Sequence, residues 1–454
     1  MSAPAKRVVV IGAGFAGLAA AVRLAHAGCL VVVVEEAPRL GGRATAFTDR
    51  ESGERVDNGQ HVLFGCYRET YAFLGRLGTA VQAPLQRRLR LVMVGDDGRR
   101  STLECPNLPA PWHLVAGLMR WSALGVGDRW SAVRLSRVLL AVRRRGAAAV
   151  AAEVAPDLTV SDWLVSRGQT PRLRDWLWHP LAIAALNQSP DVAAAAPFVR
   201  VLGELFGPRP DDAAVGLPVV PLDELYAVPA ERIIAKHGGR VLTKTAARIV
   251  LDDRGAIAGV RAGDTTIAAD AVVSSVPWHA FARLWTGDVP EPLAAIAANA
   301  AATGSSPIVT VNLWLDGPIT SDQFIGLVGG PMHWIFNKSA LYGDNTAHLS
   351  VVSSGAEELA ARDNGAIAGE AWGQLTRALP AAATRRVTRS VVVREHRATF
   401  SLAPGSPPRP ATTTRMPGFF LAGDWTDTGL PGTIEGAVLS GHRAADAILG
   451  VTDR

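Results

Sequence analysis

The N-terminal segment places a strand, a glycine-rich turn, a helix and a second strand in direct succession. Residues 7–11 are an apolar run rich in β-branched side chains, and residues 29–34 are another. Gly12, Gly14 and Gly17 follow the first run in a G-x-G-x-x-G pattern and lead into a run of strong helix formers. This order predicts a βαβ unit of the Rossmann type, which binds a dinucleotide.

Each part of this unit has a physical reason. Gly12 permits the tight turn, Gly14 lets the backbone approach a pyrophosphate, and Gly17 lets the helix pack closely on the strand. The helix start offers free N–H groups and a partial positive charge. Glu35 ends the second strand, where an acid accepts hydrogen bonds from a ribose and disfavours a 2′-phosphate. The residues expected to contact the nucleotide here are Gly12, Gly14, Phe15, Ala16, Gly17, Glu35 and Glu36.

Length and composition favour a folded, globular protein of two interleaved domains. The chain has 454 residues, of which 48% are hydrophobic and 19% charged, too long for one simple core. Cys29, Cys66 and Cys105 are odd in number and follow no metal-ligand spacing, so we expect no metal site and no disulfide framework. The chain starts without an apolar leader and has no run long enough to span a membrane. These features predict a cytoplasmic protein.

A basic segment stands out within the modest net charge of +5. Residues 106–145 interleave arginines with apolar stretches and with Trp112, Trp121 and Trp130. This pattern predicts a helix pair that lies in the headgroup plane of the inner face of the cell membrane. Ordinary amphipathic helices with solvated arginines are the alternative. Nucleic acid is not expected as a partner, because no stacking or groove-reading module accompanies the basic residues.

Two further glycine motifs resemble those of the amine oxidase and phytoene desaturase superfamily. One is Arg39-Leu-Gly-Gly-Arg43; the other runs from Gly418 through Gly423-Asp424 to a glycine-rich turn and helix near Thr433. The resemblance implies FAD as the cofactor, with the first motif along its diphosphate, Asp424 near the ribityl chain and the Thr433 helix start facing the flavin. The further cofactor residues it implies are Arg39, Gly42, Arg43, Gly59, Gln60, His61, Ala246, Gly423, Asp424, Thr433 and Ile434.

The same resemblance implies the fold. We expect an α/β protein with an FAD-binding Rossmann-like domain of the GR2 type and an inserted α+β substrate domain. Residues 1–62, 229–276 and 398–454 are predicted to form the discontinuous FAD domain. Residues 63–228 and 277–397 are predicted to form the substrate domain, which includes the basic segment.

More specific blocks resemble the hydroxysqualene dehydroxylases of bacterial hopanoid synthesis. They include Asp57-Asn-Gly-Gln-His61 and Met332-His-Trp-Ile-Phe-Asn-Lys338. The resemblance implies reductive removal of the allylic hydroxyl of hydroxysqualene, a C30 isoprenoid, to give squalene. Reduced flavin would deliver hydride to an allylic cation, and an external electron donor would reduce the flavin.

The residues for this chemistry are chosen from the same blocks. Gln60, His61 and His333 are the catalytic candidates, because a histidine is a reasonable acid near neutral pH. A structural role for His61 or Asp57, and core packing for His333 or Trp334, stay open as alternatives. The residues expected to line the substrate are Trp334, Phe336, Asn187, Gln188 and Trp425.

Three other functions remain open. A phytoene-type desaturase would use the same fold in the oxidative direction on a similar polyene. An amine oxidase would need an aromatic cage beside the flavin, which a chain with four tyrosines makes less favourable. A flavin-containing carrier of prenyl lipids, without catalysis, is the alternative from another class.

Overall fold

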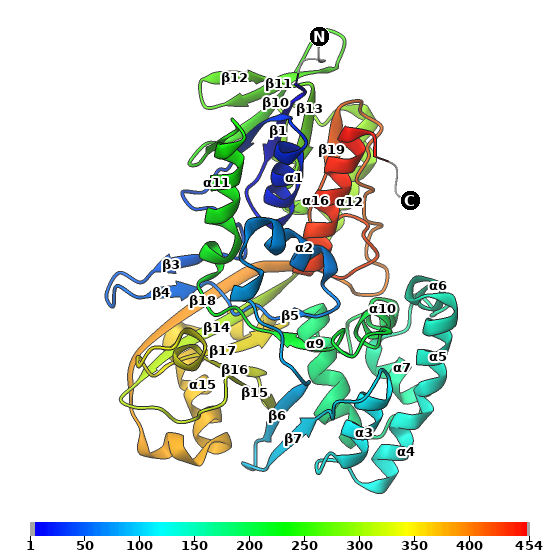
Figure 1. The fold of residues 1–454 in the computed structure, drawn as a ribbon, viewed down its shortest axis with the longest axis vertical. Coiled ribbons are helices and arrows are strands. Elements are labelled where there is room, and N and C mark those ends of the chain that lie inside the picture. Colours follow the sequence, from blue (N-terminus) through cyan, green and yellow to red (C-terminus); the bar gives the residue numbers. More distant parts are fainter. Residues whose placement is uncertain (1–4, 452–454) are drawn as a thin grey trace.

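The fold has a nucleotide-binding type of sheet at one end and a larger sheet with a helical lobe at the other (Figure 1). It was obtained as a computed structural model, which describes residues 5–451. Two long segments, β18 (Val387–Phe400) and β14 (Ser305–Leu315), cross the middle of the molecule between the two ends. The chain is therefore an α/β protein, as predicted.

The first sheet has five parallel strands in the order β19-β13-β1-β2-β9. The N-terminal segment forms β1 (Arg7–Ile11), α1 (Phe15–His26) and β2 (Leu30–Val34), which confirms the predicted βαβ unit. The other strands come from distant segments: β9 (Arg240–Leu242), β13 (Ala271–Ser274) and β19 (Phe419–Leu421). The parallel sheet thus draws on the beginning, middle and end of the chain.

Helices cover this sheet closely. Ten of the twelve residues of α1 are buried, which explains its alanine-rich sequence. The C-terminal helix α16 (Ile434–Leu449) packs on α1, and a Cβ on Gly441 would lie 2.2 Å from the carbonyl oxygen of Ala16. Glycine at this position lets the two backbones approach. Helix α11 (Val228–Lys236) packs on the other side of α1, and α2 (Arg68–Leu77) lies against α16.

The second sheet has seven strands in the order β18-β14-β17-β16-β15-β6-β7. Helix α15 (Asn364–Ala378) covers one of its faces, where Val309 and Val311 of β14 pack with Ile367 and Leu375 of the helix. Because side chains alternate along a strand, Thr310 and Asn312 point to the other face. Besides β14 and β18, the strands are β17 (His348–Ser354), β16 (Trp334–Asn337), β15 (Phe324–Val328), β6 (Arg90–Gly95) and β7 (Arg100–Glu104).

Smaller elements complete the fold. An antiparallel meander and two short pairs of strands contain β10 (Ala247–Leu251), β11 (Ile257–Ala262), β12 (Thr265–Ala268), β3 (Ala46–Thr48), β4 (Arg55–Asp57), β5 (Leu63–Phe64) and β8 (Val215–Gly216). The helical lobe contains α3 (Trp112–Arg120), α4 (Val126–Arg134), α5 (Ser136–Arg145), α6 (Ala147–Ala152), α7 (Val160–Ser166), α8 (Pro171–Leu173), α9 (His179–Leu186) and α10 (Ala195–Leu205). Connecting helices are α12 (Ala294–Ala302), α13 (Lys338–Tyr342) and α14 (Glu357–Ala360).

The basic segment differs from its prediction in two ways. It forms three helices, α3, α4 and α5, rather than a helix pair. Trp121 is only 1% exposed and packs edge-on against Trp176, so its indole belongs to the core and not to a surface anchor. Trp112 and Trp130 are exposed, as an interfacial role requires. Trp112 and Trp121 are nine positions apart, which at about 100° per residue places them on opposite sides of a helix, so that one points outward and the other inward.

Within residues 5–451, no helix is both long and apolar enough to cross a membrane. The predicted domain boundaries stay a prediction. The three segments assigned to the FAD domain contribute all five strands of the parallel sheet, and the two assigned to the substrate domain contribute six strands and most of β18 to the larger one.

Candidate active site

The two N-terminal glycine motifs meet back to back. Gly41 and Gly42 have φ angles of +106° and +56°, which favour glycine. A Cβ on Gly42 would lie 3.4 Å from the Cα of Gly14, and the Gly41 N–H donates to the Ala13 carbonyl at 2.8 Å. The backbones at 12–14 and 41–42 therefore lie against each other at the start of α1 and form what we call the glycine surface.

Tyr226 holds this surface in place. Its single hydroxyl proton is shared between the carbonyl oxygens of Gly41 and Ala44, at 2.7 and 2.9 Å, and its ring stacks on Phe15 at a centroid distance of 3.5 Å. The residue pattern did not indicate this role for Tyr226, because nothing local in the sequence points to a brace for a loop more than 180 residues away.

Glu35 lies beside this surface and ties its parts together. One carboxylate oxygen accepts from the Ala13 N–H at 2.7 Å and the other from the Ala37 N–H at 2.8 Å. The Glu35 carbonyl accepts from the N–H of Thr245, which brings the neighbouring Ala246 to the same edge of the sheet. The predicted contacts of Glu35 with a ribose and of Ala246 with the cofactor stay predictions.

An ion pair joins the first and last motifs. Arg43 contacts the Asp424 carboxylate at 2.5 Å and also donates to the Ala398 carbonyl at 2.7 Å. Asp424 is almost fully buried, and the preceding Gly423 N–H is held by the Ser440 hydroxyl at 2.7 Å. Thr433 caps the start of α16 by accepting from the Gly436 N–H at 3.1 Å. The N-termini of α1 and α16 thus reach the same region as the glycine surface.

These residues fit a flavin dinucleotide. Bare glycine backbone and the unpaired N–H groups at the first turn of α1 suit a diphosphate. The hydroxyls of Ser274 and Thr310 are buried, and neither has a hydrogen-bond partner within the described part of the chain. Buried polar atoms are rarely left unpaired unless a ligand or water meets them. They therefore mark where polar edges of a cofactor would be received.

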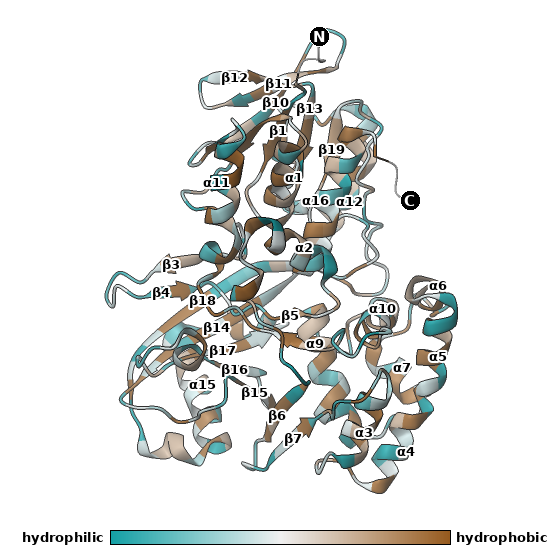
Figure 2. Cartoon of the chain, in the orientation of Figure 1, coloured by the Kyte–Doolittle hydropathy of each residue, from teal (hydrophilic) through white to brown (hydrophobic). Residues whose placement is uncertain are grey.

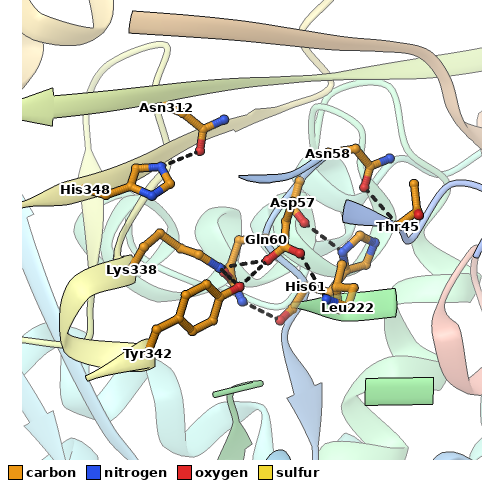
Figure 3. A network of polar contacts seen from close by, with 11 residues as sticks. Thr45, Asp57, Asn58, Gln60, His61, Leu222, Asn312, Lys338, Tyr342 and His348 are labelled. Carbon is orange, nitrogen blue, oxygen red and sulfur yellow. Dashed lines mark hydrogen bonds and ion pairs between the residues drawn. The ribbon is translucent and has the colours of Figure 1, made fainter. Parts of the chain in front are cut away.

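Beyond Arg43 lies a buried polar cluster built around Lys338 (Figure 3). The Lys338 ammonium donates to Asp57 at 2.8 Å, to the Gln60 side-chain oxygen at 2.7 Å and to the Tyr342 hydroxyl at 2.6 Å. Tyr342 donates in turn to Asp57 at 2.7 Å, and the Leu222 N–H donates to the other Asp57 oxygen at 3.0 Å. Asp57 and Lys338 are both almost inaccessible to solvent.

Burial sets the acid strength of this cluster. It lowers the pKa of Lys338, although the Asp57 carboxylate acts in the opposite direction. It also raises the pKa of Tyr342, and the Asp57 charge adds to that increase. The cluster therefore holds an ammonium that gives up its proton more readily than a free lysine, next to a phenol that stays protonated.

An apolar wall begins where the cluster ends. A cross-strand row on the face away from α15 runs Thr310, Val352, Trp334, Gly326 and Met93. A Cβ on Gly59 would lie 3.5 Å from the Thr310 hydroxyl, so the loop with Gln60 lies over the polar end of this row. Further along, the aromatic rings of Phe324 and Phe336 stack at 6.2 Å. The Tyr342 ring packs against the same apolar group and so borders both regions.

Comparison with known proteins identifies the family. Residues 15–449 match the sequence pattern of the family of flavin containing amine oxidoreductases. The chain belongs to this family. It is an FAD-dependent oxidoreductase with an FAD-binding fold. That the glycine surface and the Arg43–Asp424 pair hold the FAD stays a prediction.

Individual proteins with similar sequences or folds include two hydroxysqualene dehydroxylases, a phytoene desaturase and an oxidoreductase of known structure. The chain is 31% identical to a hydroxysqualene dehydroxylase of Rhodopseudomonas palustris, over 98% of both chains. It is 29% identical to the enzyme of the same name from Sinorhizobium fredii, over 99% of both. A 15-cis-phytoene desaturase of Capsicum annuum is 25% identical over 97% of this chain and 77% of its own. An oxidoreductase of Methanosarcina mazei has a similar fold, with a TM-score of 0.74 at 18% identity, over 97% of this chain and 100% of its own.

The oxidoreductase brings together most of the predicted site residues. Gln60 lies in the Lys338 cluster, and the His61 Nδ1 atom is 2.9 Å from the Gly59 carbonyl. Burial lowers the pKa of His61, so a neutral ring braces the loop. Trp334 and Phe336 lie on the apolar wall. Their catalytic and substrate-lining roles stay predictions.

Three residues that were predicted to line the substrate make hydrogen bonds to other parts of the protein. The Asn187 side chain bonds to Ser306, Thr399 and Gly355, and Gln188 bonds to Ser401 and Leu402. The Trp425 N–H donates to the Val276 carbonyl at 3.0 Å. In this structure all three connect segments of the fold, and any contact with substrate stays a prediction.

Replacing Gly17 by alanine should cost the oxidoreductase its cofactor. The new Cβ would lie 2.1 Å from the Gly12 carbonyl oxygen and 2.5 Å from the Ser275 hydroxyl, so α1 must move off β1. We expect flavin absorbance to be lost from the purified protein and the free energy of unfolding to fall by about 1–3 kcal/mol. Gly75→Ala is the control, since a Cβ there meets no atom within 4 Å and should stabilise α2 by roughly 0.5–1 kcal/mol. Full flavin content in Gly17→Ala would contradict this reading.

His333 should make the stability of the protein sensitive to acid. Burial lowers its pKa from 6.5 to about 4, and its Nδ1 accepts from the Ser354 N–H at 3.1 Å. The neutral ring is favoured in the folded state, so its contribution is complete above pH 6.5 and is lost as the pH falls toward 4. Urea unfolding should show that His333→Asn, which keeps an acceptor but cannot titrate, loses roughly 1–3 kcal/mol less than the parent across this interval. An equal loss in both proteins would refute the assignment.

Proposed function

We propose that this oxidoreductase removes the hydroxyl of hydroxysqualene reductively and releases squalene. The observation that carries the proposal is the contact between the buried Lys338 cluster and the apolar wall, at Tyr342. A long hydrocarbon with one hydroxyl needs such a surface, polar at one point and apolar over the rest. The full-length similarity to two hydroxysqualene dehydroxylases supports the same substrate.

The reaction balances with one proton and one hydride. The allylic C–O bond breaks as the hydroxyl takes a proton and leaves as water, and a C–H bond forms at the allylic carbon. The hydride would come from the bound FAD, once an external two-electron donor had reduced it. The residues proposed to hold it are those of the glycine surface, Glu35, Ala246, the Arg43–Asp424 pair, the loop 59–61 and the start of α16.

The proton is proposed to come from Lys338 through Tyr342. The Tyr342 hydroxyl turns from Asp57 to the substrate hydroxyl, donates its proton, and takes another from the ammonium. Asp57 and Gln60 keep the ammonium in position, because they accept its other two N–H groups. On the apolar wall, the Trp334 ring excludes water and offers its π face to the developing allylic cation.

An anaerobic single-turnover reaction tests the proposal. The purified flavoprotein is reduced, mixed with synthetic hydroxysqualene, and followed by flavin absorbance and by lipid analysis. We expect flavin reoxidation with a matching amount of squalene. If the reduced flavin does not react, while oxidised protein is bleached by phytoene or by an amine, the substrate is wrong and desaturation or amine oxidation replaces it. Lipid retained by flavin-free protein, with no turnover, would indicate a carrier.

A further inference from the structure

Exposed apolar side chains are concentrated on one part of the helical lobe. Of the twelve large hydrophobic residues exposed within residues 5–451, seven lie between positions 108 and 140. Helices normally turn such side chains inward. We define the α3–α5 surface by these residues, which are Leu108, Trp112, Val115, Val126, Trp130, Val133 and Leu140.

The spacing of these residues makes two stripes. On α4, Val126, Trp130 and Val133 follow one another at intervals of four and three, so they share one face of the helix. On α3, Trp112 and Val115 are three apart and also share a face. Val126 and the two tryptophans are each more than 60% exposed. Side chains this large and this exposed, in a row, are unusual on a protein surface that meets only water.

Positive charge lies directly beside the apolar stripes. The exposed basic residues of the same helices are Arg120, Arg134, Arg137, Arg143, Arg144 and Arg145. Only Arg145 of these forms an ion pair within the described residues, with Glu153. Arg137, Leu140 and Arg144 are three and four apart on α5, so charge and apolar side chains share one face. In Figure 2, brown and teal segments alternate along α4 and α5.

We infer that the α3–α5 surface docks onto an anionic phospholipid bilayer. Tryptophan and arginine are the side chains that suit a membrane interface, where an apolar body enters the acyl boundary and a polar end meets the headgroups. The unpaired arginines add attraction to anionic lipid. The surface lies at the opposite end of the molecule from the parallel sheet (Figure 1), so docking leaves the nucleotide-binding end free.

Vesicle binding by the FAD-loaded protein tests this inference without substrate. Sedimentation with large vesicles of phosphatidylethanolamine and phosphatidylglycerol should carry the protein down, and vesicles of phosphatidylcholine alone should do so much less. Trp112→Ser combined with Trp130→Ser should lower the partition coefficient roughly tenfold or more. Arg137→Gln combined with Arg144→Gln should lower it roughly 25-fold on anionic vesicles only, about fivefold for each arginine.

The control and the opposing outcomes are equally specific. Val81→Ser removes an apolar side chain that is 83% exposed and lies outside α3, α4 and α5, so it should not change binding. Flavin absorbance and unfolding temperature should match the parent in all variants, since the changed side chains are exposed. Absence of vesicle binding, or binding that the tryptophan variant leaves unchanged, overturns the inference. So does a dimer that dissociates in the tryptophan variant, because the surface would then be covered by a second copy.

This test is separate from that of the proposed reaction. Vesicle binding depends on the surface alone, whereas turnover of hydroxysqualene dispersed in detergent depends on the Lys338 cluster and the apolar wall. If the protein binds vesicles but does not convert hydroxysqualene, only the proposed function fails. If it converts the substrate in detergent but ignores vesicles, only the docking surface fails.

Discussion

Tyr342→Phe should lower the rate of flavin reoxidation by hydroxysqualene by about 10²–10⁴-fold while the protein keeps its FAD. This is the usual contribution of a positioned proton donor. The substitution removes one hydroxyl, which accepts from Lys338 at 2.6 Å and donates to Asp57 at 2.7 Å, and it keeps the ring that packs on the apolar wall. The Asp57–Lys338 pair itself remains, so the fold should be retained. Single-turnover absorbance under anaerobic conditions measures the effect.

Tyr71→Phe is the matched control for this change. Its hydroxyl is also partly buried and donates to the Ala83 carbonyl at 2.9 Å, but it lies on α2 outside the cluster. This variant should lose about 1 kcal/mol of stability and no activity. A pH profile adds a readout that a structural role would not move: the alkaline limb of the rate, where the Lys338 ammonium loses the proton that it donates, should disappear in Tyr342→Phe. If the variant reacts at the parent rate, Tyr342 is not on the proton path.

Asp57→Asn should destabilise the fold by about 3–5 kcal/mol. Asp57 is the carboxylate partner of a lysine that is 2% exposed, and removing one member of a buried ion pair leaves the other charge without compensation. We expect a correspondingly lower urea midpoint with an unchanged slope. Because burial already lowers the pKa of Lys338, the loss should diminish at high pH, where the lysine becomes neutral more easily.

A double-mutant cycle separates the charge effect from other effects. Lys338→Met removes the ammonium but keeps a chain of similar length, and alone it leaves Asp57 buried without its counterion. Asp57→Asn combined with Lys338→Met should recover much of the stability lost in either single variant, because no unpaired charge remains. All three variants should be inactive in the single-turnover reaction. Additive losses would mean that the two residues do not form a coupled pair.

The local pattern of residues was sufficient to predict the N-terminal βαβ unit. The apolar runs at 7–11 and 29–34, with three glycines and a helix-forming run between them, became β1, α1 and β2. Each of these elements is specified by neighbouring residues, because a buried parallel strand must be apolar throughout and a tight turn needs glycine. The assignment to an FAD-dependent family followed from motifs that are short and rich in glycine, and the match over residues 15–449 confirms it.

The buried polar cluster could not be predicted from the sequence, because its members lie far apart along the chain. Lys338 and Asp57 are separated by 281 positions, and Tyr342 and Asp57 by 285. In the sequence, a lysine after a strand is indistinguishable from a solvated one, and only the packing of α13 against the loop at 57–61 buries it. Trp121 is an opposite case. Its place in a basic segment with Trp112 and Trp130 indicated a position on the surface, but its indole is buried in the core.

The sequence by itself determined the βαβ unit, because that unit depends on residue types at short, fixed spacings, and the resemblance of its glycine motifs indicated the flavin family. Only the tertiary structure decided which hydroxyl borders the apolar wall, which tryptophans reach the surface and which polar side chains are already hydrogen-bonded within the protein. Those properties depend on burial and on pairing between distant segments. Both set the energy of a charge or an indole, and neither is a property of any single stretch of chain.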